Sequence, residues 1–378
     1  MDEDIFYKVN FLNGNPINLL CQKKDISLIK YVLIYFTFAI IFFGIAVLLV
    51  ELDQGYMMRQ GYIERSFYND YNYISFLLLT IPGLIILIIR LRWLIPRSIS
   101  ELIKSKILIL NSNYLLLVKR WNKICFRNNL IAIIFVLIFL SVAFPITIRA
   151  ISNDSIVSFQ TRGSGNFVLP GYWFIFSTLI LSVLLVSVIS LILNQIYFLK
   201  ELVQKYSEIE IQVLHPDKLG GLSPITEIGY AFQHVLVLIG INISIMIYTW
   251  FFVGVSGEFE ILVGYSIILV TLYILLTPVL FLAPLVLFRK NILKIKGHTL
   301  IKIGNQYNQK IKKHLKSDII SISPDEVDNL SNLKYLYDEV EKLPEWPFDW
   351  GTLKKLSITF FSPLIPILIS WTVKIILT

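Results

Sequence analysis

The sequence predicts an all-α polytopic membrane protein, and its composition, its apolar segments and the placement of its basic residues support this. Of 378 residues, 56% are hydrophobic and only 16% are charged, whereas soluble domains carry about 25% charged residues. Six segments reach the roughly 20 apolar residues needed to cross a bilayer. They lie at about 28–50, 72–90, 129–148, 171–194, 229–254 and 261–288.

The lysines and arginines alternate between the two sides of these spans. The N-terminal tail and every second connecting segment together hold 28 Lys and Arg, and the other connecting segments hold 4. Because basic residues accumulate on the cytoplasmic side, we expect a cytoplasmic N-terminus and an inner (plasma) membrane location. The net charge of +8 then reports topology and membrane lipids as neighbours, and it requires no nucleic-acid partner.

These spans divide the chain into four parts. Residues 1–27 form a cytoplasmic tail, and residues 28–288 form a six-helix transmembrane domain with cytoplasmic loops at 91–128 and 195–228. Residues 289–357 form a cytoplasmic helical segment. A last apolar run, 358–378, contains two prolines, which interrupt a helix. We expect it to be a C-terminal membrane-embedded helix that either crosses the bilayer or re-enters it.

The cytoplasmic segments form a small helical platform. The basic stretch after Phe288 continues the sixth span, and a second helix runs from Pro324 to about Lys342, with Ser323 and Glu326 in the spacing of a capping box. Its apolar face consists of Leu330, Leu333, Tyr337 and Val340. The loop 91–128 has two apolar patches around an Asn-Ser-Asn turn, which fits either a helix pair or a strand hairpin.

A His215-Pro216-Asp217-Lys218 tetrapeptide lies in the second cytoplasmic loop. The same string is central to J-domain chaperone cofactors, but here it follows the acidic, alternating stretch "EIEIQVL" and leads directly into a span, so no J-domain is predicted. In a structural interpretation, Asp217 accepts hydrogen bonds from backbone donors of a turn, Gly220 and Gly221 adopt positive φ, and Ser223 caps the fifth span.

A functional interpretation of the same region rests on ionisable side chains. Glu227, Tyr230 and His234 share one helical face, with His234 about 10 Å deeper than Glu227. An ionisable residue inside a span indicates a functional site. Hydroxyl and amide groups in the spans could line a conduit or join helices, and the candidate conduit-lining residues are Ser187, Asn242, Tyr248 and Thr277. No metal, cofactor or catalytic motif is recognised.

Two stretches resemble a known group of sequences. "LHPDKLGGLSPI" before a span and "LPEWPFDWGTLKK" before the terminal apolar run are similar to uncharacterised bacterial multipass membrane proteins with an H-P-D-x-x-G-G-L loop and a late W-P-F-D segment. The resemblance covers about a tenth of the chain. It implies a bacterial inner membrane and a functional core of two cytoplasmic motifs, and it assigns no reaction.

Together these patterns give the candidate functional residues: His215, Asp217, Lys218, Gly220, Gly221, Glu227, His234, Trp346, Pro347, Asp349 and Trp350. We expect the His-Pro-Asp loop to pack against "EWPFDW". The favoured function is a channel or transporter for an ion or small solute, not an enzyme, oligomeric and gated through its cytoplasmic loops. The alternatives are a membrane signalling or defence component without conduction, and an enzyme on a lipid-linked substrate with a His, Asp and Glu site at the cytoplasmic boundary.

Overall fold

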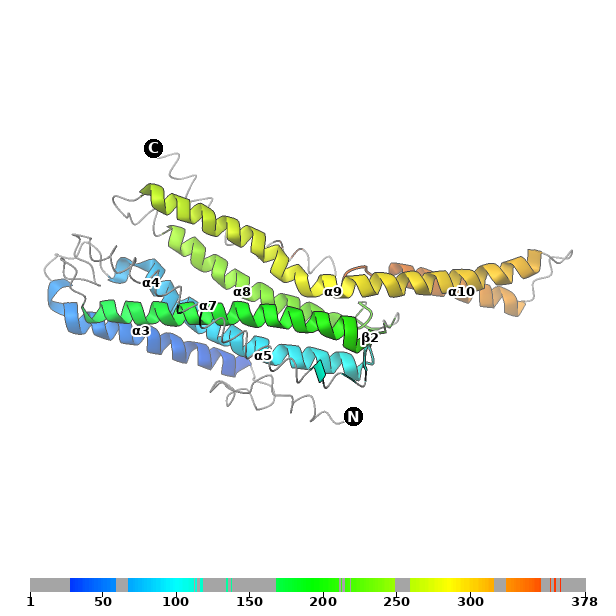
Figure 1. Cartoon of the computed structure of the whole chain (residues 1–378), viewed down its shortest axis with the longest axis horizontal. Coiled ribbons are helices and arrows are strands. Elements are labelled where there is room, and N and C mark those ends of the chain that lie inside the picture. The colour runs from blue at the N-terminus through cyan, green and yellow to red at the C-terminus, as the bar shows by residue number, and fades with distance from the viewer. Residues whose placement is uncertain are drawn as a thin grey trace.

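The computed structural model describes residues 28–58, 67–111, 168–210, 212, 215–217, 219–248, 259–315 and 324–347, with isolated positions at 113, 116, 117, 134, 137, 354, 357 and 361. Within these residues the chain is a helical bundle from which one pair of helices projects (Figure 1). The long helices are α3 (Leu28–Met58), α5 (Ile81–Lys104), α7 (Leu169–Glu201), α8 (Ser223–Tyr248), α9 (Phe259–Leu315) and α10 (Pro324–Lys342).

Shorter elements connect the long helices. A 3-10 turn, η1 (Phe67–Asn69), leads into α4 (Tyr71–Ser75) and the π-helical turn η2 (Phe76–Thr80), which continues as α5. A second π-helical turn, η3 (Leu202–Tyr206), ends α7. The strands are β1 (Leu108–Leu110) and β2 (Ser207–Ile209).

The predicted helical membrane protein is confirmed, although the number of spans is not. Five described helical stretches are long and apolar enough to cross a membrane: Ile29–Asp53, Tyr71–Lys104, Leu169–Tyr206, Ser223–Tyr248 and Tyr273–Lys312. The predicted span 129–148 and the terminal run 358–378 lie, apart from isolated positions, outside the described residues.

Helices α5 and α8 form the centre of the bundle. Half of the most apolar stretch of each is buried, against 17% for α3. The two helices approach closely at Gly83, where an added Cβ would lie 2.7 Å from the Cδ2 atom of Leu238. The core continues through Leu91, Phe232 and Phe281, so α9 is part of the same packed unit.

Two of the predicted loops begin as helix. Helix α5 extends to Lys104 and α7 to Glu201, so residues 91–104 and 195–201 are continuations of the spans. Of the two apolar patches predicted around Asn111-Ser112-Asn113, the first contains β1, and most of the second lies outside the described residues. Strand β1 pairs antiparallel with β2, with Leu108 opposite Ile209, because the alternating stretch after α7 offers a partner strand at the same end of the bundle.

Helix α9 is a single helix of 57 residues that contains Pro278 and Pro284, and its continuation beyond Phe288 agrees with the prediction. Helix α10 has the predicted bounds. Of its predicted apolar face, Val340 is buried, Leu330 and Leu333 are half-buried and Tyr337 is at the exposed margin. Residues 289–315 of α9 together with α10 are called the arm, which extends along the long axis of the molecule (Figure 1).

Candidate functional site

The His-Pro-Asp loop, residues 210–222, joins β2 to α8 at the arm end of the bundle. Gly220 and Gly221 have φ of 70° and 88°, the left-handed region that only glycine adopts without strain. The positive φ predicted for these two glycines is therefore confirmed. At Gly221 an added Cβ would also lie 1.8 Å from the Cδ1 atom of Ile107, in the link between α5 and β1. The loop can therefore approach α5 only with glycine at this position.

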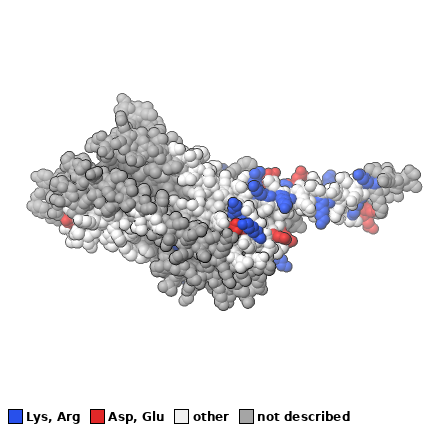
Figure 2. Space-filling model, viewed as in Figure 1, with Lys and Arg blue, Asp and Glu red and all other residues white. Residues whose placement is uncertain are grey.

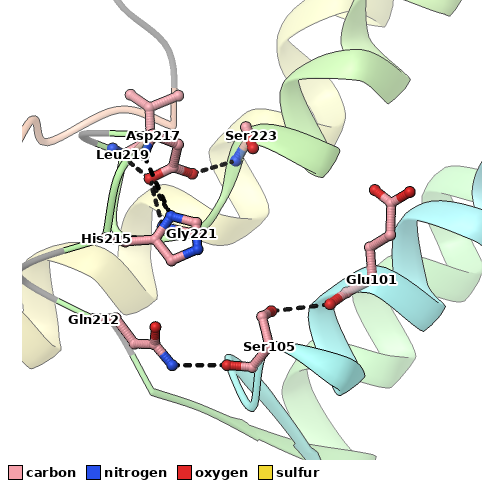
Figure 3. Close-up of polar contacts among 8 residues, drawn as sticks. All are labelled: Glu101, Ser105, Gln212, His215, Asp217, Leu219, Gly221 and Ser223. Atoms are coloured by element: carbon pink, nitrogen blue, oxygen red, sulfur yellow. Dashed lines mark hydrogen bonds and ion pairs between the residues drawn. The ribbon is translucent and has the colours of Figure 1, made fainter.

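Asp217 organises the loop through backbone donors. Its Oδ1 atom accepts hydrogen bonds from the backbone N–H groups of Leu219 and Gly221, both at 2.9 Å, and Oδ2 accepts from that of Ser223 at 3.1 Å (Figure 3). Because Ser223 is the first residue of α8, Asp217 caps the helix and places a negative charge at its positive end. Sequence reasoning assigned the cap to Ser223 itself.

His215 pairs with the same carboxylate. Its Nδ1 atom lies 2.8 Å from Oδ1 of Asp217, and because a carboxylate only accepts, Nδ1 carries the proton. Burial raises the pKa of Asp217, but the hydrogen bonds from Gly221, Leu219, Ser223 and His215 outweigh it and hold this pKa below its usual value. With four hydrogen bonds on two oxygens, Asp217 is poorly suited to act as a general base.

One side-chain and one backbone hydrogen bond, both to backbone carbonyls, fix the loop to the segment that ends α5. The Nε2 group of Gln212 donates to the carbonyl of Ser105 at 2.7 Å (Figure 3). The backbone N–H of Glu210 donates to the carbonyl of Ile107 at 2.8 Å. Through these contacts the loop, the two-stranded sheet and α5 form one junction, which we call the arm-end junction.

A short segment after α10, residues 343–347, returns from the arm to the bundle, and we call it the strap. The hydroxyl of Thr226, in the first turn of α8, donates to the carbonyl of Pro347. The guanidinium of Arg289 lies 4.5 Å from the centroid of the Trp346 ring, and its Nη2 atom is 3.7 Å from Glu345. Trp346 also packs against the hydrophobic core.

The two sequence motifs therefore lie at the same end of the bundle. Asp217 caps α8, and three residues into that helix Thr226 holds the strap. The contacts described for the side chains of His215 and Asp217 lie within their own loop and at Ser223, the first residue of α8. The motifs therefore meet through the first turn of α8. Lys218, Asp349 and Trp350 lie outside the described residues.

Glu227 and His234 are placed differently from the loop residues. Both are exposed, on the outward face of α8, and Tyr230 between them is half-buried. The Nδ1 group of His234 donates to the carbonyl of Tyr230 at 2.6 Å, so the ring binds its own helix. Among the contacts of the described residues, none joins Glu227 or His234 to His215 or Asp217.

Two of the four candidate conduit-lining residues form hydrogen bonds within the bundle. Asn242 donates to the hydroxyls of Ser75 at 3.3 Å and Thr80 at 2.8 Å, and Thr277 is 2% exposed and donates to the carbonyl of Tyr273. Ser187 is half-buried and Tyr248 is exposed. A cavity of ≈ 370 Å³ lies elsewhere, along α3 and Leu78, with apolar walls.

Sequence reasoning missed the residues that join segments, chiefly Ile107, Gln212, Thr226, Arg289 and Lys296. Their side chains act on partners far along the chain, and Lys296, for example, donates to the carbonyls of Glu341 at 2.6 Å and Leu343 at 2.7 Å. One sequence pattern did point to such a contact. Apolar and polar residues alternate before the His-Pro-Asp loop, which is typical of a strand, and this stretch begins in β2.

No protein-family model, curated protein or solved structure matches this chain. Among the described residues no group of three or more His, Cys, Asp or Glu side chains is arranged to hold a metal ion. The site is therefore interpreted from its own contacts.

Proposed function

We propose that this chain is a membrane relay, in which the arm receives an input outside the bilayer and the arm-end junction transmits it to the transmembrane bundle. The observation that carries this proposal is the continuity of α9, which runs unbroken from an apolar stretch into the arm. Pro278 and Pro284 can kink this helix, but the part after Pro284 is continuous and includes the core residues Leu285, Phe288 and Ile292 as well as the arm. Tilt or rotation of the arm therefore reaches the bundle through this part of α9.

The strap gives the arm a second connection to the bundle. Lys296 binds the carbonyl of Glu341 at the end of α10, where a lysine is favoured by the helix dipole, and the carbonyl of Leu343 in the strap. Arg289 and Thr226 then hold the strap against α9 and α8. A displacement of α10 on α9 would therefore act on the first turn of α8 and on the loop that caps it.

For location and topology we propose a bacterial inner membrane, with the N-terminus and the arm in the cytoplasm, six spans and a membrane-embedded C-terminal helix. The asymmetry of 28 against 4 basic residues between the two sets of connecting segments supports this orientation. On this topology the arm-end junction is at the cytoplasmic end of the bundle.

Hydrogen–deuterium exchange of the full chain in lipid nanodiscs tests the relay. Lys296→Met removes the bonds to the end of α10, and we expect faster exchange in α10 and also in residues 219–230. Lys302→Met is the matched control, because Lys302 is an exposed lysine on the same helix, and it should change neither region. If Lys296→Met loosens α10 while residues 219–230 exchange as before, the relay is wrong.

A second candidate is the oligomeric channel or transporter that the composition favours. The exposed Glu227 and His234 support it, because ionisable groups on the outward face of a span require polar surroundings, which a water-filled path between copies would supply. Ion flux into liposomes should then fall when His234 is replaced by Leu. If neither the unmodified chain nor the His234→Leu variant gives ion flux, the channel or transporter proposal is wrong. The relay proposal is not affected by that result.

The enzyme alternative is not proposed. It requires Asp217, Glu227 and His234 to act with His215 at one place. The oxygens of Asp217 are occupied by backbone donors, and the other two residues lie on the outward face of α8.

A further inference from the structure

The two helices of the arm carry opposite charges. Residues 289–315 of α9 contain eight Lys and Arg and no Asp or Glu, whereas α10 contains six Asp and Glu and two Lys. Figure 2 shows a basic residue at the upper edge of the arm near its tip and acidic residues at the lower edge there, whereas further from the tip basic residues lie at both edges. With so many lysines, this part of α9 does not lie in hydrocarbon, so both edges are open to water.

Four exposed charges near the tip are not paired with one another in the part of the chain that the structure describes. Among the described residues no ion pair joins Lys310 or Lys312 of α9 to Asp325 or Asp328 of α10. The reason is geometric, since the two helices pack through other faces and direct these side chains outward.

Within a wider exposed surface, each helix has a stripe of residues that faces away from its neighbour in the hairpin. In both stripes the residues recur every three or four positions, the spacing of a helix–helix seam. The α9 stripe is Lys294, His298, Ile301, Asn305, Asn308 and Lys312, all exposed. The α10 stripe is Asp328, Ser331, Tyr335 and Asp338, of which the first three are exposed and the last half-buried.

The two stripes match at equal heights along the arm. The contact of Lys296 with Glu341 and Leu343 sets the antiparallel register. Counting along both helices from this contact places Lys312 close to the level of Asp328, and Asn308 close to that of Ser331. In the same way Ile301 is near the level of Tyr335, and His298 is near that of Asp338.

The match pairs residues of complementary chemistry. Lys312 is opposite Asp328, and the amide of Asn308 is opposite the hydroxyl of Ser331. His298 is opposite Asp338. At the middle, Ile301 (65% exposed) meets Tyr335 (58% exposed). Exposed apolar residues inside a polar rim are typical of protein interaction surfaces.

We propose that the α9 stripe of one copy docks on the α10 stripe of a second copy of this chain. Copies in one membrane keep their arms parallel and at the same height, so the register is satisfied without any shift. Because the two stripes are different surfaces on opposite edges of the arm, the contact is head-to-tail and repeats around an axis until it closes into a ring. The ring does not depend on the relay.

Cysteine cross-linking of the full chain in membranes tests the ring, in a background of Cys21→Ser and Cys125→Ser. Oxidation of the double variants Ile301→Cys/Tyr335→Cys and Lys312→Cys/Asp328→Cys should give a ladder of covalent oligomers. The largest covalent oligomer in this ladder gives the number of copies in the ring. A disulfide within one chain is excluded, because the paired positions face opposite edges of the arm and a disulfide requires Cβ atoms about 4 Å apart.

The same four positions provide the control when their partners are exchanged. Ile301→Cys/Asp328→Cys and Lys312→Cys/Tyr335→Cys are mismatched in height by about 13 Å at 1.5 Å per residue, and should give at least tenfold less ladder. If all four double variants give equal amounts of cross-linked oligomer, the proposed register between the α9 stripe and the α10 stripe is wrong. Dimers alone overturn the head-to-tail arrangement, and no cross-linking in any variant means that the stripes serve a different partner.

Charge reversal tests the chemistry of the contact separately. Within the Ile301→Cys/Tyr335→Cys protein, Lys312→Asp or Asp328→Lys should lower the ladder about tenfold, since like charges then face each other. Both changes together should restore it. Two single reversals without effect, or a double variant that stays low, contradict the proposed pairing.

Discussion

The transmembrane spans and the arm-end junction use polar side chains in opposite ways. In the spans most described hydroxyls bind their own helix: Thr178 to Phe174, Ser182 to Thr178, Ser244 to Gly240 and Thr277 to Tyr273. At the junction polar side chains bind distant segments, as Gln212 binds Ser105 and Thr226 binds Pro347. Bonds within a helix carry no information about its neighbours, so tertiary placement is specified at the junction.

The spans also have exceptions that join helices. Several lie near the other end of the bundle, and Gln195 of α7 donates to the carbonyl of Leu91 in α5. Asn242 of α8 binds Ser75 and Thr80, and Tyr73 lies 3.1 Å from the hydroxyl of Ser177 in α7. The comparison predicts a simple hierarchy. Substitutions at the junction should destabilise the fold more than the same substitutions at bonds that close within one helix.

The largest effect is expected at Gly221. Gly221→Ala places a Cβ 1.8 Å from Ile107 and forces an alanine to φ +88°, so we expect a loss of about 3 kcal/mol or more in the free energy of unfolding. Gly297→Ala is the matched control, because nothing lies within 4 Å of its added Cβ and helical alanine is favoured. Thermal unfolding in detergent measures both, and equal stabilities would show that the loop tolerates displacement from α5.

A smaller loss is expected when the Asp217 carboxylate becomes an amide. Asp217→Asn replaces one accepting oxygen by a donor, and we expect a loss of about 2 kcal/mol at neutral pH, the usual cost of charge-assisted bonds. Because the folded-state pKa of Asp217 is lowered, its stabilisation is present above the unfolded value of about 3.9 and is lost as pH falls through the folded pKa.

The pH dependence makes this prediction specific. The gap in unfolding free energy between the unmodified chain and Asp217→Asn should be constant above about pH 5 and should narrow on further acidification. Chemical unfolding at a series of pH values measures it. A gap that widens towards low pH contradicts the depressed pKa and the cap that causes it.

The sequence was sufficient for most features that depend on local pattern, although not for the cap of α8 or the ends of α5 and α7. The apolar runs gave the helices, Ser323 and Pro324 gave the start of α10, and Gly220-Gly221 gave the positive φ angles. It was insufficient for β1, whose partner lies about a hundred residues away in β2. It also missed the bond between Thr226 and Pro347, because a threonine near a helix start has many possible partners and only the fold selects one.

The hydrogen bond between Thr226 and the strap gives the next test of the difference between junction and spans. Thr226→Val removes the hydroxyl that binds Pro347 at nearly constant volume, and we expect a loss of about 1 kcal/mol because a buried carbonyl loses its donor. Residues 343–347 should exchange deuterium faster. Thr226→Ser keeps the hydroxyl and should restore both properties, whereas a serine variant as weak as valine would assign the effect to packing of the methyl group.

The smallest effect is expected at Thr277, where the same substitution is made in a span. Thr277 and Thr226 are 2% and 6% exposed, so burial does not distinguish them. The Thr277 hydroxyl binds the carbonyl of Tyr273 in its own helix, and that carbonyl also accepts the regular backbone bond of the helix. We therefore expect Thr277→Val to change the free energy of unfolding by less than about 0.5 kcal/mol. If valine costs as much at Thr277 as at Thr226, hydroxyls in the spans also fix tertiary structure, and the contrast between the two regions does not hold.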